Sequence, residues 1–195
     1  MGGDDDVDDT RTAIMEATYR ALCEHGYASL TMEDIAAEFD KSKSLLHYHF
    51  DSKDALFVAF IEYLLAEFQA DVASLDGDPG DRLAEFIHRF VVDAGERDAL
   101  HLALLELRAE APFNERYREQ LAASDELVRQ AVTDIIQDGI DEGEFDPEAE
   151  PPAVARLVLA AMDGARVRGL TIGDETYPSA VRDVLYRDVL DRPAS

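Results

Sequence analysis

The sequence is short of cysteine and of uninterrupted apolar stretches. Its one cysteine, Cys23, excludes an internal disulfide, and its place among apolar helix-forming residues predicts a small buried side chain rather than a reactive thiol. No stretch reaches the roughly 18 unbroken apolar residues that a membrane span needs. Residues 1–9 are acidic, where a signal peptide would be basic. We therefore expect a soluble protein of the cytoplasm, a reducing compartment.

Positive charge is scarce as well. The chain has 18 Lys and Arg residues against 43 Asp and Glu residues, which gives a formal net charge of -25. Repulsion of this size argues against a polyanionic partner such as DNA. Abundant aspartate with few lysines is also similar to proteins of halophiles that keep molar salt in the cytoplasm. At about 1 M salt the Debye length is only about 3 Å, so the carboxylates mainly keep the surface hydrated.

What the chain does have is enough apolar residues, 47% of 195, to bury a full core. Residues 1–9 hold five aspartates and almost nothing apolar, which predicts a disordered lead-in, with structure starting near Thr10. Apolar residues at helical spacing predict a first helix over 11–25. Gly26 is expected to stop this helix, because glycine tolerates left-handed backbone geometry.

Two short helices are predicted next. Thr31 is expected to cap the first of them, and Ile35 and Phe39 lie on its buried face. Asp40 belongs to the few residue types that accept left-handed geometry, and Ser42 behind it is expected to cap another helix. The pattern therefore predicts two short helices that meet at a tight turn.

Longer helices are predicted for the rest of the chain, and no segment has the alternation of a β-strand. The first of them begins at Ser52 and ends before residue 76. The others cover about residues 83–91, 100–107, 114–141, 152–168 and 177–190. We therefore predict an all-α protein. Its expected parts are a helix-turn-helix head over 10–54 and a helical body for ligand binding and dimerisation over 55–195.

The chain's three lysines lie close together in the predicted head. Lys41, Lys43 and Lys53 fall between residues 41 and 53, where Asp51 is the one acidic residue. DNA phosphates are bound by lysine, by hydroxyl groups and by helix N-termini, all of which this window offers. The window therefore answers the charge objection to DNA, although composition alone would leave a chance surface cluster as an alternative.

The order of residues narrows this choice. Residues 26–36, GYASLTMEDIA, and residues 42–56, SKSLLHYHFDSKDAL, resemble the head of TetR-family transcription regulators. The resemblance covers about residues 11–57 and implies that the second short helix enters the major groove of double-stranded DNA. It implies phosphate contacts by Thr31, Ser42, Tyr48 and Lys53, and base-facing positions for Lys43, Ser44, Leu45 and His47. Lys41 and His49 complete the expected interface.

The head departs from the family pattern at several positions that bear on base reading. Asp40 replaces the glycine of the turn, and Lys41 replaces the apolar residue that follows it. In the second short helix, Ser44 replaces the usual small residue, Leu45 replaces the threonine-like residue after it, and His47 replaces the first tyrosine. Leu45 suits apolar contact with a thymine methyl group more than a hydrogen bond. The operator sequence therefore cannot be copied from relatives.

The predicted body resembles the C-terminal domain of BetI-type regulators in residues 104–118 and 139–145. The resemblance implies a homodimer formed by helices 123–142 and 152–168, which binds an inverted repeat and represses transcription until a small-molecule effector enters among the helices of 54–118. No cofactor is expected. The candidate effector-binding residues, each of which also suits an ordinary core or surface position, are Phe60, Leu64, Phe86, Phe90, His101, Leu104, Arg108 and Met162.

Two other functions were weighed against this one. An enzyme would need a site, and the nearest hint is a metal pair formed by His47 and His49. On a helix these side chains point apart, and no third ligand at suitable spacing completes the pair. The stronger alternative is a helical ligand-binding dimer that does not bind DNA, which the acidity and the altered turn would suit.

Overall fold

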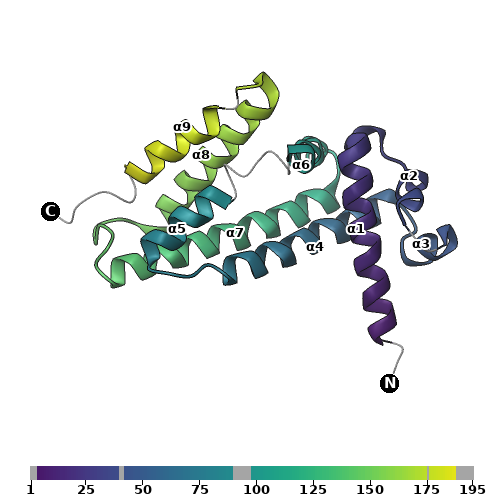
Figure 1. Ribbon diagram of the computed structural model, residues 1–195, viewed down its shortest axis with the longest axis horizontal. Helices are drawn as coiled ribbons and strands as arrows, with labels where there is room; N and C mark the ends of the chain where they lie inside the picture. The colour runs from purple at the N-terminus through teal and green to yellow at the C-terminus, as the bar shows by residue number, and fades with distance from the viewer. Residues whose placement is uncertain (1–3, 40–41, 90–97, 175, 188–195) are drawn as a thin grey trace. The chain divides into compact units, whose positions relative to one another are not determined.

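The computed structural model describes residues 4–39, 42–89, 98–174 and 176–187 (Figure 1). Within these residues the chain forms nine α-helices and no β-strand, so the predicted all-α fold is confirmed. None of the described helices is both long and apolar enough to cross a bilayer. The chain divides into two compact units: unit 1 comprises Met1–Glu67 and Ala99–Ala122, and unit 2 comprises Phe68–Asp98 and Ala123–Ser195.

Helix α1 (Asp4–Ser29) is longer than predicted. It begins at Asp4, whereas the sequence pattern predicted a start near Thr10. Near its other end the helix is interrupted at Gly26, whose φ of 68° and ψ of 159° are not helical, so the predicted stop is confirmed. A further turn follows this break, in which Leu30 N donates to Gly26 O at 3.1 Å.

Two short helices follow α1, as predicted. They are α2 (Met32–Ala37) and α3 (Lys43–His49), and Thr31 and Ser42 occupy their N-cap positions. Asp40, the expected turn residue, lies outside the described residues. Both helices thus begin directly after the residues predicted to cap them.

Unit 1 also includes parts of three longer helices, α4 (Lys53–Ala73), α6 (Asp98–Glu110) and α7 (Glu115–Asp141). One apolar core joins Ile14 of α1, Ile35 of α2 and Leu46 of α3 to Phe57 of α4 and Leu107 of α6. The short head helices therefore share their core with segments that lie after residue 54. A three-helix head has too few apolar residues to enclose these side chains by itself.

Unit 2 contains α5 (Pro79–Ile87), α8 (Pro151–Ile172) and α9 (Thr176–Leu185), together with the remaining parts of α4 and α7. Its core is built from Leu83 and Phe86 of α5, Ile135 of α7 and Val158 of α8. These residues lie on the apolar faces that the sequence pattern predicted for their helices. Helices α8 and α9 pack against each other, as Figure 1 shows.

Proline and glycine delimit the helices of unit 2. α5 and α8 begin with Pro79 and Pro151 at positions where the missing amide costs little. α8 ends before Gly173, whose φ is 68°. After α7 the chain turns back so closely that a Cβ on Gly139 would lie 2.3 Å from Phe145 Cδ2, a separation that excludes any larger residue.

Candidate nucleic-acid interface

Helix α2 is held at its first turn by a reciprocal cap. Asp34 N donates to Thr31 Oγ1 at 3.2 Å, and Thr31 N donates to Asp34 Oδ2 at 2.8 Å. The Thr31 hydroxyl also donates to Asp34 Oδ2 at 2.6 Å, and these hydrogen bonds lower the pKa of the Asp34 carboxyl. Thr31 is exposed, so its expected phosphate contact would be made by a hydroxyl that already caps α2.

Helix α3 turns one residue inward and most of the others toward solvent. Leu46 is fully buried and anchors the helix in the core of unit 1. Ser42, at the N-cap, makes no side-chain cap hydrogen bond, and Leu45 N donates instead to its backbone oxygen at 2.9 Å. Tyr48 is 82% exposed. The other exposed residues predicted to contact DNA are Ser42, Lys43, Ser44 and His47, whereas Leu45 and His49 are half-buried.

Lys43 is paired with an acidic residue of α2. Its Nζ donates to Glu33 Oε1 at 2.5 Å, and both side chains remain exposed, at 52% and 78%. The hydrogen bond from Lys43 and its charge lower the pKa of the Glu33 carboxyl. No local pattern in the sequence predicts this pair, because its two residues are ten positions apart and lie on different helices.

Lys53 points into the protein rather than away from it. Its Nζ donates to Tyr27 O at 2.6 Å and lies 4.2 Å from the centre of the Tyr27 ring and 5.7 Å from that of Phe57. Burial lowers the pKa of the lysine, and the nearby charges of Asp54 and Glu106 oppose this shift. In this structure Lys53 therefore holds the end of α1 against the start of α4, where a phosphate contact was expected.

A polar network surrounds Tyr27, and the sequence pattern did not predict it. Tyr117 of α7 is 1% exposed, and its hydroxyl donates to Asp54 Oδ1 at 2.9 Å while accepting from the Tyr27 hydroxyl at 3.2 Å. Glu106 Oε2 of α6 accepts from Ala28 N at 3.1 Å. These bonds join the segment before α2 to α4, α6 and α7 within unit 1. The partners are 60 to 90 residues apart, so no local sequence pattern signals them.

Two of the residues singled out from sequence have no described placement. Lys41, expected in the DNA interface, and Phe90, expected in the effector site, lie outside the described residues. Among the residues that are described, no group of three or more His, Cys, Asp or Glu side chains is arranged to hold a metal ion.

The other candidate effector-binding residues divide between the two units. Phe60 is fully buried in the core of unit 1, which Leu64 and Leu104 also contact, whereas Arg108 is exposed. His101 lies in unit 1 as well, and is half-buried. Phe86 and Met162 are buried in the core of unit 2.

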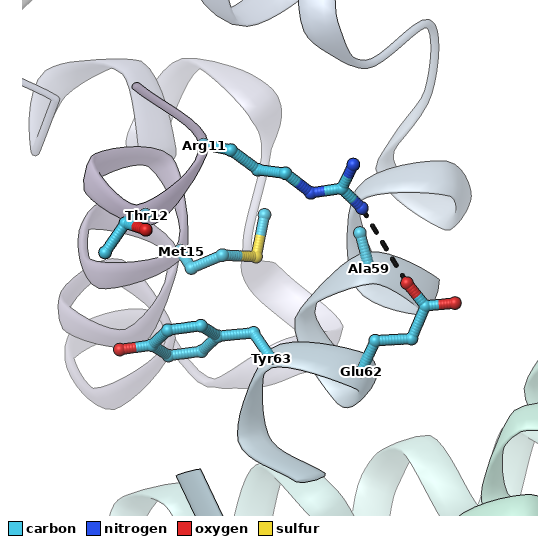
Figure 2. A pocket seen from close by; sticks show the side chains of 6 residues that line it. All are labelled: Arg11, Thr12, Met15, Ala59, Glu62 and Tyr63. Atoms are coloured by element: carbon cyan, nitrogen blue, oxygen red, sulfur yellow. Dashed lines mark ion pairs between the residues drawn. The ribbon is translucent and has the colours of Figure 1, made fainter. Parts of the chain in front are cut away.

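A small open pocket lies elsewhere in unit 1, between α1 and α4 (Figure 2). Its volume is about 220 Å³, and its lining includes an ion pair of 3.7 Å between Arg11 Nη2 and Glu62 Oε2. Met15 and Tyr63 lie beside this pair in the close-up view. None of the eight candidate residues lines the pocket, and its volume is below the roughly 300 Å³ at which ligand pockets begin.

Comparison with known proteins identifies the family. Residues 14–60 match bacterial regulatory proteins of the tetR family, and residues 79–192, more than half of the chain, match the C-terminal domain of BetI-type transcriptional repressors. The crystal structure of a TetR transcription regulator from Haloarcula marismortui ATCC 43049 is 38% identical, with a TM-score of 0.85 over 94% of this chain and 99% of that one. The chain belongs to the TetR family.

Two further proteins are similar to the chain at lower identity. The HTH-type transcriptional regulator UidR of Escherichia coli strain K12 is 28% identical over 154 residues, which are 77% of this chain and 76% of the relative. A putative transcriptional regulator from Saccharomonospora viridis, crystallised in complex with choline, shares the fold at 22% identity, with a TM-score of 0.81 over 95% of this chain and all of that one. The protein is thus a DNA-binding transcription regulator whose helix-turn-helix is formed by α2 and α3.

Proposed function

We propose that the protein is a homodimeric repressor that binds an inverted-repeat operator through α3 and releases it when a small-molecule effector binds. The observation that carries the DNA contact is the exposed side of α3. Leu46 anchors this helix in the core while Lys43, Ser44, His47 and Tyr48 stay open to solvent. Hydroxyl, imidazole and ammonium groups along the exposed side of a helix suit the base edges and phosphates of a major groove.

Each residue of the proposed interface is assigned a role according to how far its side chain is exposed. Lys43, Ser44 and His47 are assigned to base edges or to the backbone next to them. Thr31, Ser42 and Tyr48 are assigned to phosphates, which hydroxyl groups bind without reading sequence. Leu45 keeps its proposed apolar contact with a thymine methyl through the part of its side chain that the core leaves uncovered. Lys41 and His49 are retained as neighbouring backbone contacts.

An exposed apolar stripe on α8 supports the homodimer. Leu157 is 60% exposed and Val167 37% exposed, and Ala160 and Gly164 lie between them on the same face at helical spacing. Apart from the adjoining residues of α8 itself, no atom of the described residues lies within 4 Å of a Cβ placed on Gly164, so another helix can approach its backbone closely. A second copy of the chain would cover this stripe, and a twofold dimer would present two α3 helices to an inverted repeat.

The effector-binding role is proposed from similarity to known regulators, because no candidate residue lines the pocket described above. The putative transcriptional regulator from Saccharomonospora viridis, which shares the fold, was crystallised with choline, and this supports a ligand-sensing role for the body of this chain. The candidate contacts remain Phe60, Leu64, Phe86, Phe90, His101, Leu104, Arg108 and Met162. The same kinship with transcription regulators supports a non-catalytic role in the cytoplasm.

Selection of binding sites from random duplexes tests the DNA contact. We expect the wild type to select an inverted repeat, and Lys43→Ala and His47→Ala to change the bases preferred within each half-site. The same consensus for all three proteins would show that neither residue reads bases. A wild type that selects no duplex would favour the alternative of a ligand-binding dimer without DNA binding.

Light scattering combined with size-exclusion chromatography tests the dimer. Leu157→Glu places a charge on the α8 stripe, so this variant should elute as a monomer and lose operator binding. Phe113→Glu is the matched control, because Phe113 is 87% exposed and lies outside the stripe, in the turn between α6 and α7. A Leu157→Glu variant that remains dimeric would contradict the proposed interface.

A further inference from the structure

The lysines that the structure describes in the head already have partners. Lys53 donates to Tyr27 O at 2.6 Å, and Lys43 donates to Glu33 Oε1 at 2.5 Å. The Lys53 contact is half-buried, whereas the Lys43 contact lies at the surface. A phosphate or base that binds Lys43 therefore competes with the Glu33 carboxylate for the ammonium charge.

The Glu33–Lys43 pair links the two helices of the helix-turn-helix. Glu33 lies in the first turn of α2, and Lys43 is the first residue of α3. Two other carboxylates of this region are occupied elsewhere, since Asp34 caps α2 with Thr31, and Glu38 accepts from Arg20 Nε at 3.3 Å. Among the described residues, Glu33 is thus the carboxylate that faces the ammonium at the start of α3.

We infer that Glu33 competes with DNA for Lys43 and thereby makes operator binding less sensitive to salt. This inference rests on the proposed DNA contact of α3. When Lys43 moves to DNA, the Glu33 carboxylate loses its partner and lies near the phosphates, which repel it. The repulsion lowers affinity most in dilute salt, where the Debye length is about 10 Å, and little at about 1 M, where it is about 3 Å.

Salt then acts on two opposing contributions to binding. Counterion release weakens each lysine–phosphate contact as salt rises. Salt also weakens the exposed Glu33–Lys43 pair and screens the repulsion between Glu33 and DNA, and both changes favour binding. The two contributions partly cancel in the wild type. Removing the Glu33 charge removes the second contribution, so affinity in dilute salt should rise and the salt dependence should become steeper.

Glu33→Gln tests this inference with little risk to folding, because the side chain is 78% exposed and glutamine keeps its size. Glu38→Gln is the matched control: it removes the same charge from the same helix-turn-helix, and its partner is Arg20 rather than a lysine of the interface. The two variants are also made in a Lys43→Gln background, which lacks the ammonium for which Glu33 and DNA compete. In that background Glu33→Gln and Glu38→Gln should change DNA affinity equally.

Affinity is measured by fluorescence anisotropy with the duplex selected by the wild type. At about 0.2 M KCl we expect Glu33→Gln to bind about three- to tenfold more tightly than the wild type, and at about 2 M KCl less than about twofold more tightly. Glu38→Gln should stay within about twofold of the wild type at both concentrations. Thermal melting of each variant checks that its fold is unchanged.

Two outcomes would overturn the inference while leaving DNA binding intact. Equal effects of Glu33→Gln and Glu38→Gln would show that only the net charge matters. Weaker binding by Glu33→Gln would show that the carboxylate positions Lys43 or accepts from a cytosine amino group itself. A wild type that binds no duplex at either salt concentration would overturn the proposed function and this inference together.

Discussion

Replacing Tyr117 with phenylalanine tests the buried polar network of unit 1. The hydroxyl of Tyr117 donates to the Asp54 carboxylate and accepts from Tyr27, so the substitution removes two hydrogen bonds without leaving a large cavity. A hydrogen bond to a charged group contributes about 1.5–3 kcal/mol to the free energy of unfolding, and a neutral one about 1 kcal/mol. Because Asp54 is exposed and can bind water instead, we expect a total loss of about 1.5–2.5 kcal/mol.

The assay is chemical and thermal unfolding of the two proteins under identical salt. For a chain of this size a loss of this magnitude corresponds to a melting temperature lower by about 5 °C. Tyr63→Phe is the control, because it removes a hydroxyl beside the open pocket of Figure 2, and should cost less than about 0.5 kcal/mol. A loss for Tyr117→Phe no larger than that of the control would refute the argument.

The pH dependence of this difference provides a second check. Burial, and then the hydrogen bonds with Tyr27 and Asp54, raise the pKa of Tyr117 far above its usual value of 10.0. The folded protein therefore keeps a proton that the unfolded chain releases above about pH 10. The stability from this hydroxyl is fully present below that pH and declines above it. The gap between wild type and Tyr117→Phe should narrow above about pH 10, and a constant gap up to about pH 11 would contradict the reasoning.

Three further predictions concern the head and the surface charge. Thr31→Ala should lower the free energy of unfolding by about 1–2 kcal/mol, because it removes the side-chain cap of α2. Ser42→Ala should change it by less than about 0.5 kcal/mol, because the Ser42 hydroxyl makes no cap hydrogen bond. Equal losses for the two variants in denaturant titrations would contradict this. Lys53→Met should lower the free energy of unfolding by about 1 kcal/mol, because it removes the hydrogen bond to Tyr27 O, and should weaken binding to all DNA sequences alike. Weaker DNA binding with unchanged stability would indicate a direct phosphate contact. With a net charge of -25, the melting temperature should rise from about 0.2 to about 3 M KCl, and a flat profile would argue against adaptation to high salt.

The sequence by itself determined the class of fold and most helix boundaries. Thr31 marks a helix start through a side-chain cap that a neighbour within one turn completes, and Pro151 through its fixed backbone geometry. The order of residues in 26–56 likewise identified the helix-turn-helix. Local composition placed the start of α1 too late, because a polar, acidic segment has no apolar periodicity that would mark it as helical.

The tertiary structure alone decided which partner each polar side chain takes. Lys53 and Lys43 look alike in the sequence, as cations in one basic window. In the fold, one lysine bonds to the backbone of Tyr27 and the other to Glu33. The bond between Tyr117 and Asp54 spans 63 positions of the chain. Such contacts depend on how the helices pack, and packing is set by the whole core rather than by the few residues that local periodicity describes.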